Sequence, residues 1–154
     1  MKIFFIISSI FLVLPFLLGD KKFFIVNTSA STPIGIYRVK YNQTPSLGDY
    51  VVFSSSILSQ NEFPNLPQRI IKEVRGIPGD TIFSSDETIL IRGISYDLNP
   101  RVKTRTCPLG VIPKGYFFLA TDHPLSLDSR YFGLVPSREL QYLQRRKKDA
   151  RNYF

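Results

Sequence analysis

The chain has 154 residues and a formal net charge of +8, and many of its lysines and arginines gather near the C-terminus, at residues 145–151. This length fits one domain with a single small core. No recognition module accompanies the basic run and no aromatic residues alternate with it, so we expect no nucleic-acid partner. Cys107 is the only cysteine, which excludes an intrachain disulfide and a cysteine-based metal site. We also expect no cofactor.

An apolar run occupies the N-terminus. Residues from Ile3 to Gly19 carry no charge, and as a helix they would reach about 25 Å, short of a hydrocarbon core of roughly 30 Å. Snorkelling of Lys21 and Lys22 would close that gap. A cleaved signal peptide is the alternative, but the residues that end the run lack the small-x-small pattern of a cleavage site. We therefore expect residues 1–20 to form a retained anchor that crosses the lipid bilayer once.

Short strands and turns are predicted for the rest of the chain. Phe, Tyr, Ile and Val are prominent in the sequence, and these residues favour strands. Residues 54–67 are polar and contain prolines, which indicates a loop, and Ser137 is a candidate cap for a short helix. The pattern of apolar residues predicts strands within residues 23–26, 36–39, 50–53, 69–74, 81–83, 88–91 and 114–120.

Two serines follow the first predicted strand. Ser29 and Ser31 are two residues apart, so their hydroxyls point the same way if the chain approaches Ser31 in an extended conformation. Pro33 and Gly35 then turn the chain. By itself, such a cluster of Ser, Thr, Pro and Gly is typical of a plain loop.

A lysine interrupts the apolar face of another predicted strand. In an extended strand Lys72 shares its face with Ile70 and Val74, and this face is the one expected to be buried. Burial of an ammonium group is costly. Either Lys72 lies at an edge and reaches water, or it is buried because its chemistry requires it.

Three stretches, in order, resemble the boxes of the type I signal peptidases. They run from Ser31 to Tyr37, from Ile71 to Asp80 and from Ser126 to Gly133. Leu47 to Val51 and Gly115 to Leu119 are placed as that family places its supporting segments. The form Ser-x-Pro-x-Gly-Ile-Tyr is similar to that of the conjugative-transfer branch, the TraF-type peptidases that mature pilin subunits.

The resemblance implies a Ser/Lys dyad on a mainly β, mostly antiparallel fold. Ser31 would be the nucleophile and Lys72 the general base, with its pKa lowered by desolvation. The backbone N–H of Ser31 and the hydroxyl of Ser29 would hold the oxyanion. The residues expected to support Lys72 are Ser126, Asp128 and Arg130.

The resemblance also implies a substrate and a location. The substrate would be an exported precursor protein or pilin, and its extended chain would pair with the strands before Ser31 and at Lys72. The protein would lie in the bacterial inner membrane with its catalytic domain on the periplasmic side. We expect a peptidase β domain over residues 21–136 and a basic tail over residues 137–154.

The sequence departs from the family at three points. Thr32 stands where the family usually has Met, and Thr121 to His123 replace the usual Gly-Asp-Asn. The short strand with Gly and Ala that normally closes the domain is absent, and Leu140 to Leu143 and the basic tail replace it.

Other readings remain open on the sequence. The protein could be a general type I signal peptidase that removes signal peptides, or a non-catalytic, membrane-anchored pilus assembly module. A Ser/His/Asp triad would have to use His123, the only histidine. A soluble, self-cleaving Ser/Lys repressor is disfavoured by the apolar N-terminus.

Overall fold

The computed structural model describes residues 24–59, 61–102 and 109–145, and these form two antiparallel sheets joined by turns. Besides two short 3-10 helices, Ser55–Ile57 and Ser137–Glu139, the elements are β1 (Phe24–Asn27), β2 (Gly35–Lys40), β3 (Tyr50–Ser54), β4 (Arg69–Gly76), β5 (Thr81–Ser84), β6 (Thr88–Ile91), β7 (Ile94–Asp97), β8 (Gly110–Val111), β9 (Tyr116–Ala120), α2 (Ser129–Phe132), β10 (Val135–Pro136) and β11 (Gln141–Arg145).

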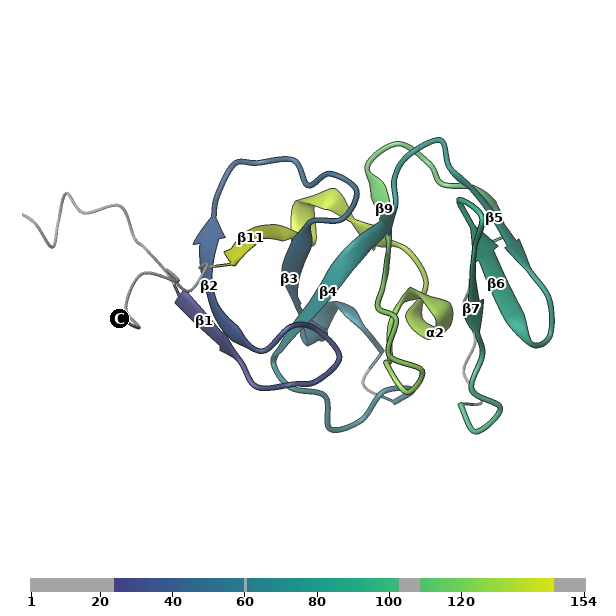
Figure 1. The fold of residues 1–154 in the computed structure, drawn as a ribbon, viewed down its shortest axis with the longest axis horizontal. Helices are drawn as coiled ribbons and strands as arrows, with labels where there is room; N and C mark the ends of the chain where they lie inside the picture. Colours follow the sequence, from purple (N-terminus) through teal and green to yellow (C-terminus); the bar gives the residue numbers. More distant parts are fainter. Residues whose placement is uncertain (1–23, 60, 103–108, 146–154) are drawn as a thin grey trace, which may run out of the picture.

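The larger sheet has the order β1-β2-β11-β3-β4-β9-β10, and the smaller sheet has the order β7-β6-β5-β8. All of their pairings are antiparallel. The expected mainly β, mostly antiparallel fold is therefore confirmed. Figure 1 shows the two sheets side by side, with α2 between them.

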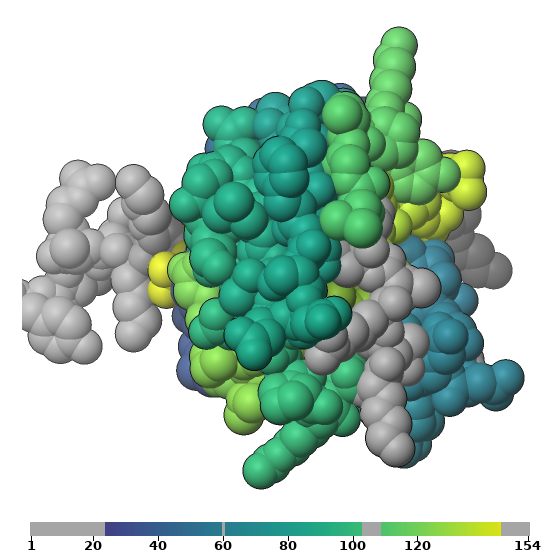
Figure 2. Space-filling view, turned by 90° about the vertical axis from the view of Figure 1, so that its right-hand side faces the viewer, coloured from purple at the N-terminus to yellow at the C-terminus, as the bar shows by residue number. Residues whose placement is uncertain are grey.

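One hydrophobic core cluster lies where the two sheets meet. Alternate residues of the small sheet, such as Ile82, Ile89 and Ile91, pack against Phe118 of β9 and Tyr131 of α2. In an antiparallel sheet that is covered on one side only, such alternation is expected. Figure 2 shows the opposite, outer side of the small sheet, coloured teal.

β4 positions the residues that matter most for the site. Its burial alternates along the strand, so that Ile70, Lys72, Val74 and Gly76 are buried. Lys72 therefore shares its face with Ile70 and Val74, as the sequence predicts, and the reading as an exposed edge lysine is wrong. The N-terminal half of β4, from Arg69 to Lys72, pairs with β3, and the pairing with β9 begins only at Glu73.

The C-terminal part of the sequence departs from expectation. Gln141–Arg145 is a strand, β11, and it lies inside the large sheet between β2 and β3. A tail that starts at residue 137 is therefore wrong, because a strand without Gly or Ala lies within that range and belongs to the sheet. The prediction failed because Leu143 is the only fully buried side chain of β11, so this polar strand shows little hydrophobic signal although its backbone is paired on both sides.

Two further expectations concern other parts of the chain. The predicted short helix after Pro136 is a single 3-10 turn, and Ser137 is its first residue rather than a side-chain cap. The expected membrane anchor, residues 1–20, lies outside the described residues. Within the described ranges, no helix has the length and apolar character needed to cross a membrane.

Candidate active site

Asn27, the last residue of β1, organises the loop that carries the two serines. It is 6% exposed, and its side-chain Nδ2 donates to the backbone oxygens of Ser29, Thr32 and Pro33 and to Thr32 Oγ1. Its Oδ1 accepts the backbone N–H of Ser29. The hydroxyl of Tyr37 also donates to the Pro33 carbonyl, at 2.6 Å. These bonds fold residues 28–34 into a tight loop.

The loop brings the Ser29 and Ser31 hydroxyls together. Their Oγ atoms are 3.0 Å apart, and the backbone N–H of Ser31 donates to Ser29 Oγ at 3.4 Å. The chain does not approach Ser31 as an extended strand, because β1 ends at Asn27. The expected closeness of the two hydroxyls is found, but it results from a turn that Asn27 holds.

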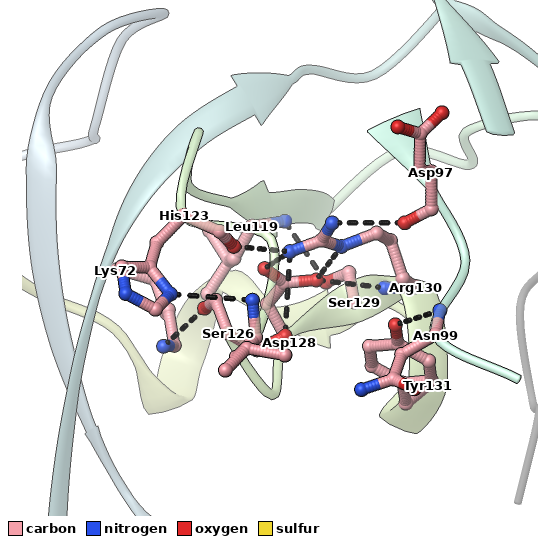
Figure 3. A network of polar contacts seen from close by, with 11 residues as sticks. Lys72, Asp97, Asn99, Leu119, His123, Ser126, Asp128, Ser129, Arg130 and Tyr131 are labelled. Atoms are coloured by element: carbon pink, nitrogen blue, oxygen red, sulfur yellow. Dashed lines mark hydrogen bonds and ion pairs between the residues drawn. The ribbon is translucent and has the colours of Figure 1, made fainter. Parts of the chain in front are cut away.

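Lys72 presents a buried amine. The residue is 5% exposed, and Nζ donates to Ser126 Oγ at 2.8 Å, as Figure 3 shows. Desolvation by burial lowers the pKa of Lys72, and nearby Asp128 acts in the opposite direction. A lysine in such surroundings gives up its proton more easily than a lysine in water, and it can then serve as a base.

A buried ion pair supports the segment that carries Ser126. Arg130 Nε and Nη2 donate to the two carboxylate oxygens of Asp128 at 2.8 and 2.7 Å. Nη2 also donates to the backbone oxygens of His123 and Ser126. Both charged side chains are almost fully buried, 0% exposed for Asp128 and 2% for Arg130. The attraction between the two charges offsets the cost of burying them. The bonds from Arg130 to the two backbone oxygens fix the chain over residues 123–126.

The same network ties this segment to the core. Ser129 Oγ accepts the backbone N–H of Leu119 in β9, at 2.9 Å. Arg130 Nη1 donates to the carbonyl of Asp97 at the end of β7. Figure 3 shows that Arg130 lies at the centre of these contacts, with Lys72 on one side and Asp97 on the other. The position of Ser126, and through it that of Lys72, is therefore set by both sheets.

Ser31 and Lys72 line one groove. This first groove has a volume of about 580 Å³, and it runs between β1 and the N-terminal half of β4. Its lining includes Ser29, Ser31 and Lys72, together with other residues of both strands. A hydroxyl and a lysine with a lowered pKa in one groove are the groups that nucleophilic attack on a carbonyl requires.

His123 is placed differently from a triad histidine. Its Nδ1 accepts the backbone N–H of Leu125 at 3.2 Å. A catalytic histidine would use that nitrogen to donate to a carboxylate. No such carboxylate bonds to His123 among the described residues, so the geometry does not favour the triad.

Sequence reasoning missed Asn27 and Ser129. An Asn that follows a strand and precedes Ser-x-Ser is a recognisable signal, because its side chain commonly bonds the backbone two residues on. Ser129 gave no comparable signal, because its partner Leu119 lies on another strand. The residues predicted to support Lys72 lie in one network, and Ser126 contacts the lysine directly.

Comparison with known proteins identifies a family and a relative that this chain resembles. The model of the family described as "Signal peptidase, peptidase S26" matches residues 1–142. The chain is 26% identical over 139 residues to "Conjugal transfer protein TraF" of Agrobacterium fabrum strain C58, covering 78% of this chain and 79% of that protein.

Two further similarities concern signal peptidases by name. The chain is 26% identical over 109 residues to "Signal peptidase I" of Leptolyngbya laminosa, covering 68% of this chain and 54% of that protein. The chain therefore spans about half the length of that relative. The crystal structure of a signal peptidase I from Enterococcus faecalis V583 matches with a TM-score of 0.39 and 25% identity, covering 64% of this chain and 94% of that chain.

Proposed function

We propose that this chain, which belongs to the signal peptidase family, peptidase S26, is a serine endopeptidase that uses Ser31 and Lys72 to cleave exported precursor proteins. The observation that carries this proposal is the first groove, where the Ser31 hydroxyl and the buried Lys72 amine line the same space. Burial is costly for a lysine that only contributes structure, but it gives a lysine base the low pKa it needs.

In this mechanism the neutral amine of Lys72 takes the proton of the Ser31 hydroxyl. Ser31 Oγ attacks the scissile carbonyl carbon, and the carbonyl oxygen becomes an oxyanion. When the intermediate collapses, the C–N bond breaks and the protonated Lys72 gives its proton to the departing amine. Water, deprotonated by the same amine, then hydrolyses the ester on Ser31 and releases the acyl product.

The oxyanion would be held by the backbone N–H of Ser31 and the hydroxyl of Ser29. In the structure the Ser31 N–H donates to the Ser29 hydroxyl, with 3.4 Å between Ser31 N and Ser29 Oγ. A hydroxyl rotates easily, so Ser29 can donate to an oxyanion that arrives beside the Ser31 N–H. Donors placed in advance in this way stabilise the charge that develops in the transition state.

Ser126, Asp128 and Arg130 would act through Lys72. Ser126 Oγ accepts from Nζ and so directs the amine, while the Asp128–Arg130 pair fixes the backbone on which Ser126 stands. None of the three needs to touch the substrate. Their contribution is to hold the base within reach of the nucleophile.

The substrate would lie in the first groove as an extended chain. β1 is an edge strand that pairs only with β2 in the described sheet, and Ile70 to Lys72 of β4 have β3 as their only strand partner among the described residues. Two strand edges to which no further strand is paired therefore line the groove. Added strands recognise such edges through main-chain hydrogen bonds.

Within this family we propose pilin processing in a conjugative transfer system as the more specific role. Its support is the similarity to the conjugal transfer protein over 78% of this chain. Residues 1–20 would anchor the protein in the inner membrane, with the β domain on the periplasmic side. General removal of signal peptides is the second candidate, because the chain is also similar to a signal peptidase I. A non-catalytic assembly module would leave the buried amine of Lys72 unexplained.

The test replaces each member of the dyad. Ser31→Ala and Lys72→Ala should each abolish precursor processing, and the double variant should lose little more because the two residues act as a unit. Ser95→Ala and Lys114→Ala, at exposed positions, serve as matched controls and should process normally. The measurement is processing of a co-expressed precursor, with circular dichroism to verify folding. Normal processing by folded Ser31→Ala would refute the assignment.

A further inference from the structure

A second groove reaches Ser31 from the other side. It has a volume of about 630 Å³ and is formed by the loop after Ser31, by Tyr50 and Glu73 of β3 and β4, and by the turn that follows β9. Ser31 lines both this groove and the first groove. If Ser31 attacks a peptide bond, the chain on one side of that bond occupies the first groove and the chain on the other side occupies the second.

The two grooves differ in charge. The described residues that line the first groove include Arg69 and Lys72 and no carboxylate. The described residues that line the second groove include Glu73 and Asp122 and no lysine or arginine. A polypeptide that passes Ser31 therefore meets carboxylates on one side of the nucleophile only.

The carboxylates of the second groove retain capacity for a ligand. A single atom, Arg75 Nη2, donates to Glu73 Oε2 at 3.0 Å and to Asp122 Oδ2 at 2.9 Å. Two carboxylates thus share one guanidinium. Among the described residues, Glu73 Oε1 and Asp122 Oδ1 accept no hydrogen bond. Glu73 is only 17% exposed and Asp122 is 78% exposed, so one of the carboxylates is partly shielded from water and the other can move towards a ligand.

An independent observation points to the same place. Thr121 also lines the second groove and is only 3% exposed. Its Oγ1 is buried without a hydrogen-bond partner within the described ranges. Buried hydroxyls are nearly always satisfied, so the unpartnered hydroxyl of a residue that lines this groove points to a polar partner that the described residues do not supply.

The chemistry of acyl transfer assigns a direction to the two grooves. The acyl part of the substrate stays bonded to Ser31 until water arrives, so it has to be held through both steps. The first groove suits this task because two strand edges line it and supply main-chain pairing. The segment that leaves after the first step then occupies the second groove.

We infer that the second groove binds the segment that follows the scissile bond and selects a lysine or arginine there, through Glu73 and Asp122. This inference rests on the proposed peptidase function. An ammonium or guanidinium group would donate to the unused carboxylate oxygens, and Thr121 Oγ1 could accept a further bond. The same charges would disfavour an acidic residue at these positions.

The test is cleavage of a peptide library in which the residues on both sides of the cut vary. The full chain, purified in detergent, is incubated with the library, and the cut positions are read by mass spectrometry. We expect Lys and Arg to be enriched within the first two residues after the cut, by roughly three- to tenfold over neutral residues, as fits one or two partly exposed charge pairs. Glu73→Gln and Asp122→Asn should each reduce that enrichment.

Controls separate this inference from the peptidase assignment. Glu87→Gln removes an exposed carboxylate outside both grooves and should keep the enrichment. Asp122→Asn is informative even if Glu73→Gln fails to fold, because Asp122 is largely exposed. Cleavage that depends on Ser31 but shows no cationic preference after the cut, or shows it before the cut, would overturn the inference and leave the peptidase function standing. Absence of any Ser31-dependent cleavage would overturn both.

Discussion

Lys72 combines two properties that rarely occur together in one side chain, deep burial and an ionisable amine. Its single hydrogen bond among the described residues goes to a neutral hydroxyl, that of Ser126. Asp128, the carboxylate whose charge raises the pKa of Lys72, is engaged by Arg130 through both of its oxygens. The negative charge that would otherwise keep the lysine protonated is thus largely neutralised. Desolvation therefore remains the dominant influence on its pKa, and it lowers that pKa.

The pH dependence of cleavage follows from this shift. Below its lowered pKa, Lys72 is protonated and cannot accept the proton of Ser31, so activity should be low there and rise as pH increases through that pKa. Because lysine starts from a value near 10.4, we expect the rising limb above neutrality. The measurement is cleavage of a precursor peptide in detergent between pH 5 and 10.

His123→Ala is the control for this profile. Under the Ser/Lys mechanism the variant keeps the alkaline limb, because the histidine does not transfer the proton. A histidine base would give a limb near its ordinary pKa of about 6.5. An acidic limb in the wild type, together with loss of activity in His123→Ala, would contradict the lysine assignment.

Much of this site follows from sequence, but not the way in which it is held together. The period of two along β4 predicts that Lys72 faces the core, because burial along a strand depends only on alternation. The role of Asn27 depends on a loop in which one amide reaches three carbonyls. That conformation has no periodicity, so the sequence does not reveal it. The sequence predicts that the two serine hydroxyls are close, but on the assumption of an extended strand, whereas a turn brings them together.

At the level of elements, β4 links the two sheets through Gly76. Its pairing with β9 shifts register between Val74 and Gly76. A side chain at Gly76 would lie 2.8 Å from Ile112 Cδ1 and 2.9 Å from Phe118 Cβ, and it would also contact Ile91. Two of these neighbours belong to the small sheet and its connection, and one belongs to β9. The small sheet can pack closely on β4 because this position has no side chain.

Gly76→Ala should therefore destabilise the protein. Phe118 Cβ is attached directly to the backbone of β9 and cannot turn away as the end of an isoleucine can, so the paired strands β4 and β9 must move apart at this point. Overpacking of this kind costs about 1–3 kcal/mol. Urea unfolding of Gly76→Ala measures the cost, and Ser95→Ala, on the exposed side of β7, is the control. An unchanged free energy of unfolding would show that the interface is looser than these distances imply.

Across the whole molecule, the order of the large sheet differs from the order of the chain. β1 and β2 carry the serine loop, and β11 separates them from β3 and β4. Hydrophobic pattern predicts strands one at a time, and it found most of these strands. It does not reveal which strands pair, and a polar strand such as Gln141–Arg145, inserted from the far end of the sequence, escapes it.

The last prediction concerns this inserted strand. A chain that ends after Leu140 loses the partner of both β2 and β3 and the buried side chain of Leu143. The hairpin that carries Ser31 is then no longer attached through the sheet to the strand that carries Lys72. We expect this chain to lose cooperative thermal unfolding and precursor processing. A chain that ends after Arg145 keeps β11 complete and should unfold and process like the full-length protein. Circular dichroism melts and the processing assay make the comparison, and a chain ending at Leu140 that retained both properties would contradict this role for β11.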